Sequence, residues 1–298
     1  MQGRNDGAGF EGLQVGDAVR KLERDLEAAG VETPDRDARV LVAASLGATP
    51  ADLILNPDRR LDAGEARCLA GYGRRRAARE PCSRILGERE FWGRKFRITP
   101  ATLDPRPETE TLIEAALEIA REEGWCQSPI RILDVGTGSG CLLLTLLAEL
   151  PHAIGVGTDI SAEALAVAEE NSRRLGLSGR ARFEQRGSLG GLCATFELLL
   201  CNPPYVATGA IATLPPEVRT YDPLAALDGG EDGLGAVREL APDLVRVVPR
   251  GWSLFEVGAG QSDAVSKILR EACPGALAIR VWTDLGDHVR CVAIQTHL

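Results

Sequence analysis

The segment Asn202-Pro203-Pro204-Tyr205 carries residue types suited to holding a planar NH2 group, and it follows the apolar run 196–201. Proline ends the hydrogen-bond ladder of a strand, and the residue before a proline is pushed to extended geometry. We therefore expect Asn202 at a rigid strand end, where its side-chain carbonyl and a backbone carbonyl accept the two hydrogens of an amide or amino nitrogen. Tyr205 adds a flat face with a polar tip. An ordinary Asn-Pro turn that closes a strand explains the tetrapeptide equally well.

A glycine-rich motif, Gly136-Thr137-Gly138-Ser139-Gly140, lies between an apolar strand-like run and an apolar helix-like run. Glycine allows positive φ and close approach of a ligand, and the free amides at a helix start favour a polar or negative group. The spacing differs from the dinucleotide fingerprint G-x-G-x-x-G, because Cys141 stands where the third glycine would be. The motif predicts a site for a nucleotide-type cofactor.

Asp159 follows the next apolar run, 153–157, and so places a carboxylate at the end of a second strand. There it can accept hydrogen bonds from the two hydroxyls of a ribose. It can also be the N-cap of a helix that begins near Ser161, and the two roles do not exclude each other. The predicted cofactor-binding residues are Gly136, Thr137, Gly138, Ser139, Gly140, Asp159 and Asn202.

The elements that must position these residues fall into an N-terminal helical part and a C-terminal α/β part. Apolar residues at helical spacing predict a small bundle over residues 15–80, after a disordered extension over residues 1–14 that is rich in Gly, Asn and Asp. Alternating aromatic and apolar positions predict a β-hairpin linker over 81–107.

Residues 108–298 alternate between helix and strand, which predicts a doubly wound α/β sheet with the ligand at the carboxyl ends of its strands. Both motifs fall on that edge. The last two strands are close enough in sequence to pair as an antiparallel hairpin. The expected strands are 130–135, 154–159, 181–185, 196–201, 251–257, 277–283 and 289–296, and the expected helices are 108–121, 140–150, 162–175, 232–247 and 261–272.

Taken together, these residues resemble an S-adenosylmethionine-dependent methyltransferase that methylates amino or amide nitrogens. Further stretches are similar to the release factor glutamine methyltransferases, the HemK/PrmC family. The resemblance covers most of residues 15–296 and includes the stretches 88–93, 102–110, 217–223, 227–230 and 255–258.

The resemblance implies methyl transfer from S-adenosylmethionine to the side-chain amide nitrogen of the glutamine in the Gly-Gly-Gln motif of peptide chain release factors. It implies a Rossmann-like methyltransferase domain over 108–298 and a substrate-docking role for the helical bundle. Asn202, Pro203 and Tyr205 are the implied catalytic residues, and Pro204 joins them in substrate binding. No metal is needed. Glu108 and Glu110 would lie near the site, although a place at a helix N-terminus explains them equally well.

Three departures from the family pattern bear on this resemblance, and the first is that residues 1–12 have no match. The loop 185–189 lacks the acidic-aromatic pair that often stands beside the adenine, so the adenine contact is left unassigned. Val289 stands where the family often has an acid before Arg290, which predicts the loss of an ion pair.

Composition is that of a soluble, cytoplasmic two-domain enzyme, which we expect to be a monomer. The 298 residues are 44% hydrophobic, and no apolar run approaches the roughly 20 residues that cross a bilayer. The eight cysteines are scattered without a C-x-x-C pair, which indicates free thiols in a reducing compartment and no zinc site. The basic run 74–76 with Arg79 is typical of a solvated helix face.

Two rival functions remain open from the sequence. The exocyclic amine of adenine fits the same two acceptors, so a nucleic-acid adenine N6-methyltransferase is the alternative; the net charge of −9 and the lack of an evident target-recognition domain argue against nucleic acid as a partner. The other rival is a nucleotide-binding module without catalysis. Two intact motifs in one chain argue against it.

Overall fold

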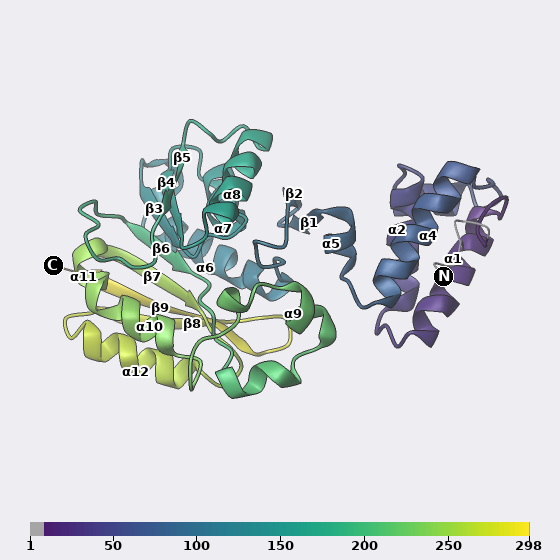
Figure 1. Ribbon diagram of the computed structural model, residues 1–298. Coiled ribbons are helices and arrows are strands. Elements are labelled where there is room, and N and C mark those ends of the chain that lie inside the picture. Colours follow the sequence, from purple (N-terminus) through teal and green to yellow (C-terminus); the bar gives the residue numbers. More distant parts are fainter. Residues whose placement is uncertain (1–8, 298) are drawn as a thin grey trace. The chain divides into compact units, whose positions relative to one another are not determined.

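The computed structural model describes residues 9–297 and divides into two compact units (Figure 1). The first, the helical unit, runs from Met1 to Gly87, and the second, the sheet unit, runs from Glu88 to Leu298. None of the helices in residues 9–297 is long and apolar enough to span a membrane.

Within residues 9–87, the helical unit packs five helices around one apolar core. Leu22 and Leu26 of the first helix meet Leu41 of the second and Leu69 of the fourth, all fully buried, because each helix repeats apolar residues on one face. The helices are α1 (Val15–Ala28), α2 (Pro34–Ser45), α3 (Pro50–Leu55), α4 (Ala63–Ala77) and α5 (Cys82–Leu86).

The predicted disordered extension, 1–14, is wrong for residues 9–14, and residues 1–8 lie outside the described part of the chain. Phe10 is buried in the bundle core, and the backbone N–H of Gly12 donates to the carbonyl of Leu61 over 3.1 Å. A single aromatic residue therefore anchors a segment whose other residues are polar or small, which its composition did not reveal.

The basic run at the end of α4 is not a solvated face throughout. Arg76 is 5% exposed, and its Nε atom donates to Asp37 of α2 over 2.6 Å. Arg75 pairs with Glu80 at 2.5 Å, and Arg79 donates to the carbonyl of Gly30 at 2.8 Å. Periodicity alone could not identify Asp37 and Gly30 as partners, since they lie 39 and 49 positions away in the chain.

The helical unit also ends later than residue 80, where the sequence placed the start of a hairpin linker. Residues 82–86 form α5, and Ile85 is buried in the bundle core. The β-pairing itself begins in the sheet unit, where β1 (Glu88–Phe91) runs antiparallel to β2 (Arg94–Arg97).

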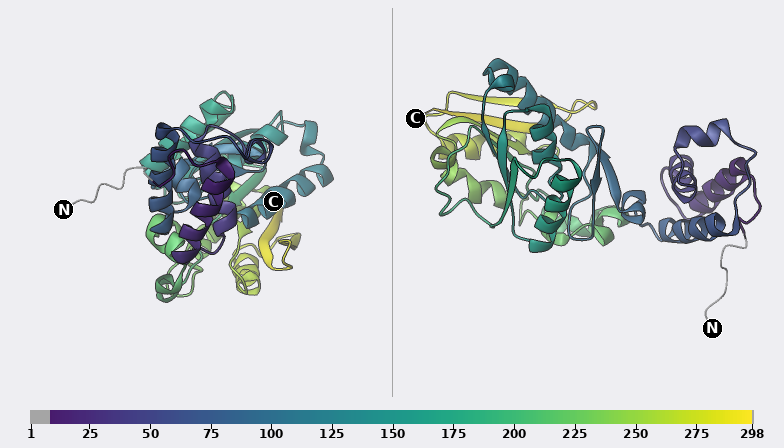
Figure 2. Two further views of the ribbon diagram at one scale, coloured as in Figure 1. Left: turned by 90° about the vertical axis from the view of Figure 1, so that its right-hand side faces the viewer. Right: turned by 90° about the horizontal axis from the view of Figure 1, so that it is seen from above.

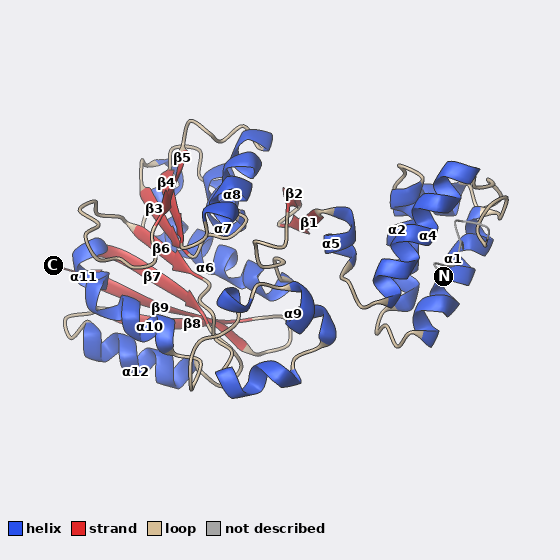
Figure 3. Cartoon of the chain, in the orientation of Figure 1, coloured by secondary structure: helices blue, strands red, loops and turns tan. Residues whose placement is uncertain are grey.

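The sheet unit contains, within residues 88–297, a seven-stranded sheet of order β5-β4-β3-β6-β7-β9-β8 (Figure 3). The first five strands of this order are parallel, while β9 runs antiparallel to β7 and β8. This confirms the predicted doubly wound sheet with a C-terminal antiparallel hairpin, coloured yellow in Figure 2. The strands are β3 (Arg131–Val135), β4 (Ile154–Asp159), β5 (Ala181–Gln185), β6 (Leu198–Cys201), β7 (Arg250–Glu256), β8 (Ala278–Thr283) and β9 (Val289–His297).

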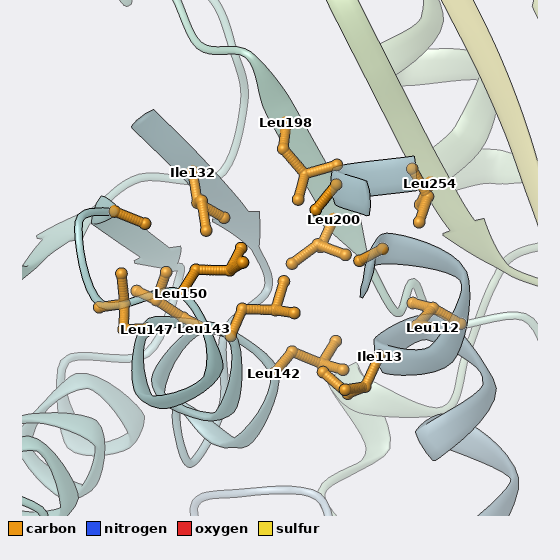
Figure 4. Packing of buried hydrophobic residues seen from close by; sticks show 14 of the residues in the cluster. Leu112, Ile113, Ile132, Leu142, Leu143, Leu147, Leu150, Leu198, Leu200 and Leu254 are labelled. Carbon is orange, nitrogen blue, oxygen red and sulfur yellow. The ribbon is translucent and has the colours of Figure 1, made fainter. Parts of the chain in front are cut away.

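Helices cover both faces of the sheet. On one face α6 (Glu110–Glu122) and α7 (Cys141–Glu149) pack on alternate strand residues such as Ile132 and Leu200, as Figure 4 shows. On the same face α8 (Ala162–Arg174) lies next to α7 and contacts β4 and β5. On the other face lie α10 (Gly235–Leu240), α11 (Leu244–Val247) and α12 (Ser262–Ala272). The remaining helical segments are α9 (Pro216–Tyr221) and the 3-10 turns η1 (Pro107–Thr109), η2 (Trp125–Gln127), η3 (Thr208–Thr213), η4 (Leu224–Ala226) and η5 (Ala241–Asp243).

One predicted helix, 232–247, is interrupted. It begins only at Gly235, and η5 separates α10 from α11. Pro242 lies within η5 and lacks the backbone N–H that a continuous α-helix needs there, so the chain tightens into a 3-10 turn.

Strand register brings the motifs to one edge of the sheet. Val135 of β3 lies opposite Thr158 of β4 and Cys201 of β6, and Cys201 lies opposite Phe255 of β7. Because parallel strands end at the same edge, the glycine loop, Asp159, Asn202 and Glu256 all follow at the carboxyl ends of neighbouring strands.

Candidate active site

A cavity of about 590 Å³ opens at this edge, within the sheet unit. This volume falls in the range of about 300–1,000 Å³ that is typical of small-molecule sites. Its wall combines the two sequence motifs with a segment of residues 99–110, which we call the approach segment. The lining includes residues 101–103, Pro105, Thr109, 135–139, Cys141, Leu142, 159–161, Glu163, Arg186, Gly187, 201–204, Pro223, Ala225, Ala226, Ala236, Glu239 and Leu240.

The glycine loop is shaped by positive φ angles. Gly138 has φ of 53°, and its N–H donates to Oδ2 of Asp159 over 2.9 Å. Gly140 has φ of 80°, and a Cβ atom there would come within 3.0 Å of the Leu144 side chain and 3.3 Å of Ala168. Side chains larger than glycine would thus strain the turn or push α7 away from α8.

Asp159 holds the loop while keeping acceptor capacity toward the cavity. Its Oδ1 accepts from the backbone N–H of Ser161 at 3.0 Å, so each carboxylate oxygen receives one backbone bond. Each oxygen has a second lone pair, which leaves room for two hydroxyl donors. The N-cap of α8 is Ser161, whose Oγ accepts from the N–H of Ala164 at 3.1 Å, so the capping interpretation of Asp159 is wrong.

Asp134 lies under the loop, a position to which the sequence assigned no role. It is 1% exposed, and its Oδ2 accepts from the Thr137 hydroxyl at 2.6 Å and from the N–H of Leu143 at 3.4 Å. Burial raises the pKa of Asp134 to about 6, and the bond from Thr137 opposes that rise. Asp134 therefore ties the loop to the first turn of α7.

The tetrapeptide presents acceptors to the same cavity. Asn202, Pro203 and Pro204 line it, and the Nδ2 atom of Asn202 donates to Oγ1 of Thr109 over 3.3 Å. Since the amide nitrogen is engaged with Thr109, the side-chain oxygen of Asn202 is left to accept. The described residues supply no hydrogen bond to the carbonyl oxygen of Pro203.

Tyr205, by contrast, is not among the described residues that line the cavity. Its backbone carbonyl accepts from Nε2 of Gln261 at 3.0 Å, and Gly233 lies so close that a Cβ there would be 2.2 Å from this oxygen. Burial, followed by the charge of Glu256, raises the pKa of the Tyr205 phenol to about 12. The contacts of Tyr205 with Gln261 and Gly233 thus hold the backbone at the end of the tetrapeptide.

Charged side chains hold the approach segment against the rest of the sheet unit. Arg106 pairs with Asp222 at 2.5 Å, and the N–H of Asp104 also donates to Asp222 at 3.3 Å. Glu110 accepts from the N–H of Trp92 at 2.7 Å, so it fixes the β1–β2 turn and does not face the cavity. Glu108 is exposed.

Besides Asp134, sequence reasoning missed Thr109, Arg186 and Glu256. Thr109 and Arg186 line the cavity, and Glu256 ends β7 beside the tetrapeptide. Thr109 and Glu256 stood inside stretches that carried the family resemblance, and Arg186 lay in the loop 185–189 that was left unassigned. Their roles depend on neighbours from other strands, which sequence spacing does not reveal.

Two other observations concern the surroundings of the site. Arg290 pairs with Asp284 at 2.7 Å, so the arginine that follows Val289 has an acidic partner from the β8–β9 turn. Whether or not an acid at position 289 pairs in the relatives, Arg290 of this chain is held by Asp284. Within residues 9–297 no cluster of three or more His, Cys, Asp or Glu side chains is arranged to hold a metal ion.

Comparison with known proteins agrees with this geometry. The PrmC N-terminal domain model matches residues 17–87, and the methyltransferase small domain model matches residues 121–214. The release factor glutamine methyltransferase of Bradyrhizobium diazoefficiens is 45% identical over 264 residues, which cover 88% of this chain and 89% of that protein. The enzyme of the same name from Caulobacter vibrioides is 43% identical, with 90% and 91% covered.

The chain belongs to the release factor glutamine methyltransferase family. Members of this family are S-adenosylmethionine-dependent methyltransferases, and the cofactor of this enzyme is S-adenosylmethionine. Among solved structures, the hMettl16 catalytic domain in complex with MAT2A 3'UTR hairpin 1 is similar, with a TM-score of 0.57 and 18% identity over 70% of this chain and 77% of that one. This likeness concerns the fold of the sheet unit.

The residues present fit this cofactor. Asp159 retains acceptor sites for a ribose diol, and the glycine loop opens its backbone toward the same cavity. Ile160 and Leu240 add apolar surface, and Arg186 and Gly187 line the wall next to Ile160. In this chain, therefore, the loop 185–189 contributes an arginine and a glycine where the family often has an acidic-aromatic pair.

Proposed function

We propose that this enzyme methylates the side-chain amide nitrogen of the glutamine in the Gly-Gly-Gln motif of peptide chain release factors. Asn202 and Pro203 hold the amide, Pro204 shapes the turn, and Tyr205 supports it from behind. Asp159 and residues 136–140 hold the cofactor. The family membership supports the substrate class, and the arrangement of the cavity supports the residue roles.

When bound, S-adenosylmethionine supplies an electrophilic methyl group attached to a positively charged sulfur. A glutamine amide is a poor nucleophile, because its nitrogen lone pair is delocalised into the carbonyl. The task of the protein is therefore to orient the amide and to favour a pyramidal nitrogen.

Two acceptors perform this task. The amide N–H groups of the substrate donate to the Asn202 side-chain oxygen and to the Pro203 carbonyl, so the lone pair of the nitrogen points toward the methyl group. Proline contributes because its ring fixes the backbone and its lack of an N–H prevents competition for these acceptors. No side chain has to act as a nucleophile.

One observation carries the proposal: a single cavity is lined by both the glycine loop with Asp159 and the acceptors Asn202 and Pro203. A cofactor site alone would not need the tetrapeptide, and a simple strand-ending turn would not need to face a cofactor cavity.

Mass spectrometry of a purified release factor, incubated with enzyme and S-adenosylmethionine, tests the proposal. We expect one added methyl group on the Gly-Gly-Gln glutamine. A release factor with glutamate at that position is the matched control and should remain unmodified. Methylation of adenine in DNA or RNA, with no change in the release factor, would instead favour the alternative function, a nucleic-acid adenine N6-methyltransferase.

The proposed substrate also implies where the enzyme acts and what it binds. The substrates are cytosolic translation factors, so we place the enzyme in the cytoplasm, acting as a monomer without direct nucleic-acid contact. The net charge of −9 is unfavourable for binding phosphate backbones. The helical unit, residues 15–80 in the sequence prediction, supplies the surface that docks the release factor.

A further inference from the structure

A buried acid lies directly behind the substrate-gripping asparagine. Cys201 and Phe255 are register partners on β6 and β7, so Asn202 and Glu256 are the next residues on neighbouring parallel strands. Glu256 is 2% exposed, and its Oε2 atom has no hydrogen-bond partner among the described residues. Burying a carboxylate that is not fully hydrogen-bonded costs stability, so a purely structural role does not account for it.

Thr109 connects this acid to Asn202. Its hydroxyl lies close enough to the Glu256 carboxyl to lower the pKa of that acid, and its Oγ1 accepts from Nδ2 of Asn202 at 3.3 Å. Thr109 is 2% exposed and lines the cavity. The three side chains therefore follow one another from the cavity wall into the interior of the sheet unit.

The direction of hydrogen-bond donation along these three side chains decides which atom of Asn202 faces the substrate. An amide side chain can turn over, and each orientation presents either its oxygen or its NH2 group. A hydroxyl has one hydrogen to donate, and an ionised carboxylate can only accept. Ionised Glu256 takes the hydrogen of Thr109, so Thr109 must accept from Asn202, and the amide oxygen of Asn202 is turned toward the cavity.

We propose that Glu256, acting through Thr109, is a positioning residue that holds the Asn202 amide with its oxygen toward the substrate. This inference rests on the proposed function, because it assigns a consequence only to an Asn202 that accepts from the substrate amide. The Tyr205 hydroxyl lies near the same acid and also lowers the pKa of Glu256.

Protonation of Glu256 would reverse the direction of hydrogen-bond donation along these side chains. A protonated carboxyl can donate to Thr109, which then donates to Asn202 and favours the turned amide. Burial raises the pKa of Glu256 to about 7, the Thr109 hydroxyl, Arg290 and the Tyr205 hydroxyl lower it, and Glu108 raises it. The other groups that sense its charge are the thiols of Cys141, Cys201 and Cys291.

The active form is the ionised one, so turnover should rise with pH through this range. The positively charged sulfur of the cofactor favours the ionised acid, so the midpoint in the cofactor complex should lie at or below about 7.

The test compares Glu256→Gln, Thr109→Val and Thr109→Ser with the wild-type enzyme, with release factor as substrate and S-adenosylmethionine saturating. Misorienting a reactive group costs about tenfold to a hundredfold in rate, so we expect this loss of kcat in Glu256→Gln and Thr109→Val. Thr109→Ser keeps the hydroxyl and should restore most of the rate. Cofactor affinity, measured by calorimetry, should stay within about threefold.

Two further readouts separate positioning from simple structural support. The rise of kcat with pH should disappear in Glu256→Gln. The double variant Glu256→Gln with Thr109→Val should be no slower than Thr109→Val alone, because both residues act through the same contact with Asn202. Thr145→Val is the matched control: the Thr145 hydroxyl is buried in α7 with no partner among the described residues, so its removal should leave kcat unchanged.

Wild-type rates and an unchanged pH profile in Glu256→Gln would overturn the inference. If that variant does not fold, equal rates for Thr109→Val and Thr109→Ser overturn it as well. An inactive wild-type enzyme would refute the proposed function itself, and that outcome is distinct because no variant is needed to see it.

Discussion

At the scale of single residues, the roles that we propose separate binding the cofactor from orienting the substrate. Asp159 belongs to the first task, because its oxygens hold the glycine loop and keep free acceptor sites toward the cavity. Asn202 belongs to the second, because its nitrogen is engaged by Thr109 and its oxygen is left to accept. The two residues therefore predict different kinetic defects.

Asp159→Ala should weaken binding of S-adenosylmethionine by about 1–3 kcal/mol, the usual cost of leaving buried polar groups unpaired. The loss includes the ribose hydroxyls and the backbone N–H of Gly138. Calorimetry measures it, with Asp263→Ala on the exposed side of α12 as a control that should bind normally. An unchanged affinity would reduce Asp159 to a clamp for the loop.

Asn202→Ala and Asn202→Asp should both keep cofactor affinity within about tenfold, or roughly 1.4 kcal/mol. Both should lose at least about a hundredfold in turnover on release factor, because they remove an interaction made with the reacting nitrogen. Aspartate also places a negative charge near the positive sulfur, which strengthens ground-state attraction without helping the charge-dispersed transition state. Near wild-type turnover by Asn202→Ala would show that the substrate is gripped elsewhere.

At the scale of elements, the turn from β3 to α7 exists because its glycines adopt positive φ. Gly138 has no close neighbour that a Cβ would strike, since the nearest atom is 4.0 Å away, so its need is conformational and it also leaves the cavity wall open. The carboxylates of Asp159 and Asp134 then fix the loop from two sides.

Gly138→Val should abolish detectable cofactor binding, because a β-branched residue at φ of 53° is strained and its side chain would occupy the approach to the loop backbone. The control is Gly179→Ala, at a glycine with negative φ and open space around it, which should bind normally. Thermal unfolding of both variants should show that the sheet unit still folds. Normal binding by a folded Gly138→Val would contradict the assignment of the loop.

At the scale of the whole molecule, the chain forms two units with separate cores. The helical unit has a core of its own, and the cavity is lined entirely by residues of the sheet unit. An enzyme that methylated any exposed glutamine would damage proteins broadly, so we propose that its selectivity comes from docking a large partner on the surface of the helical unit.

An enzyme shortened to begin at Glu88 should therefore bind S-adenosylmethionine as the full chain does and lose most activity on intact release factor. The comparison is made by calorimetry and by the rate of methylation, with a short Gly-Gly-Gln peptide as the matched substrate. The peptide should be methylated equally and slowly by both forms. Equal activity on intact release factor with and without residues 1–87 would contradict the docking role.

Much of this protein could be predicted from its sequence because the decisive motifs are contiguous. Residues 136–140 and 202–205 each carry their chemistry within one turn, and alternation of helix and strand placed both at the carboxyl edge of the sheet. The places where prediction failed depended on single residues: Phe10 anchors a polar segment, Pro242 interrupts a helix, and Ile85 extends the bundle.

The neighbours of the motifs were decided only by the tertiary structure. Thr109 is 93 positions from Asn202 in the chain, and Glu256 reaches it through the pairing of β6 with β7. Such contacts depend on strand order and register, which arise from packing the whole sheet unit. The spacing of residues in the sequence therefore does not predict them. The sequence alone therefore determined which chemistry the site can perform, whereas the fold decided which side chains orient the groups that perform it.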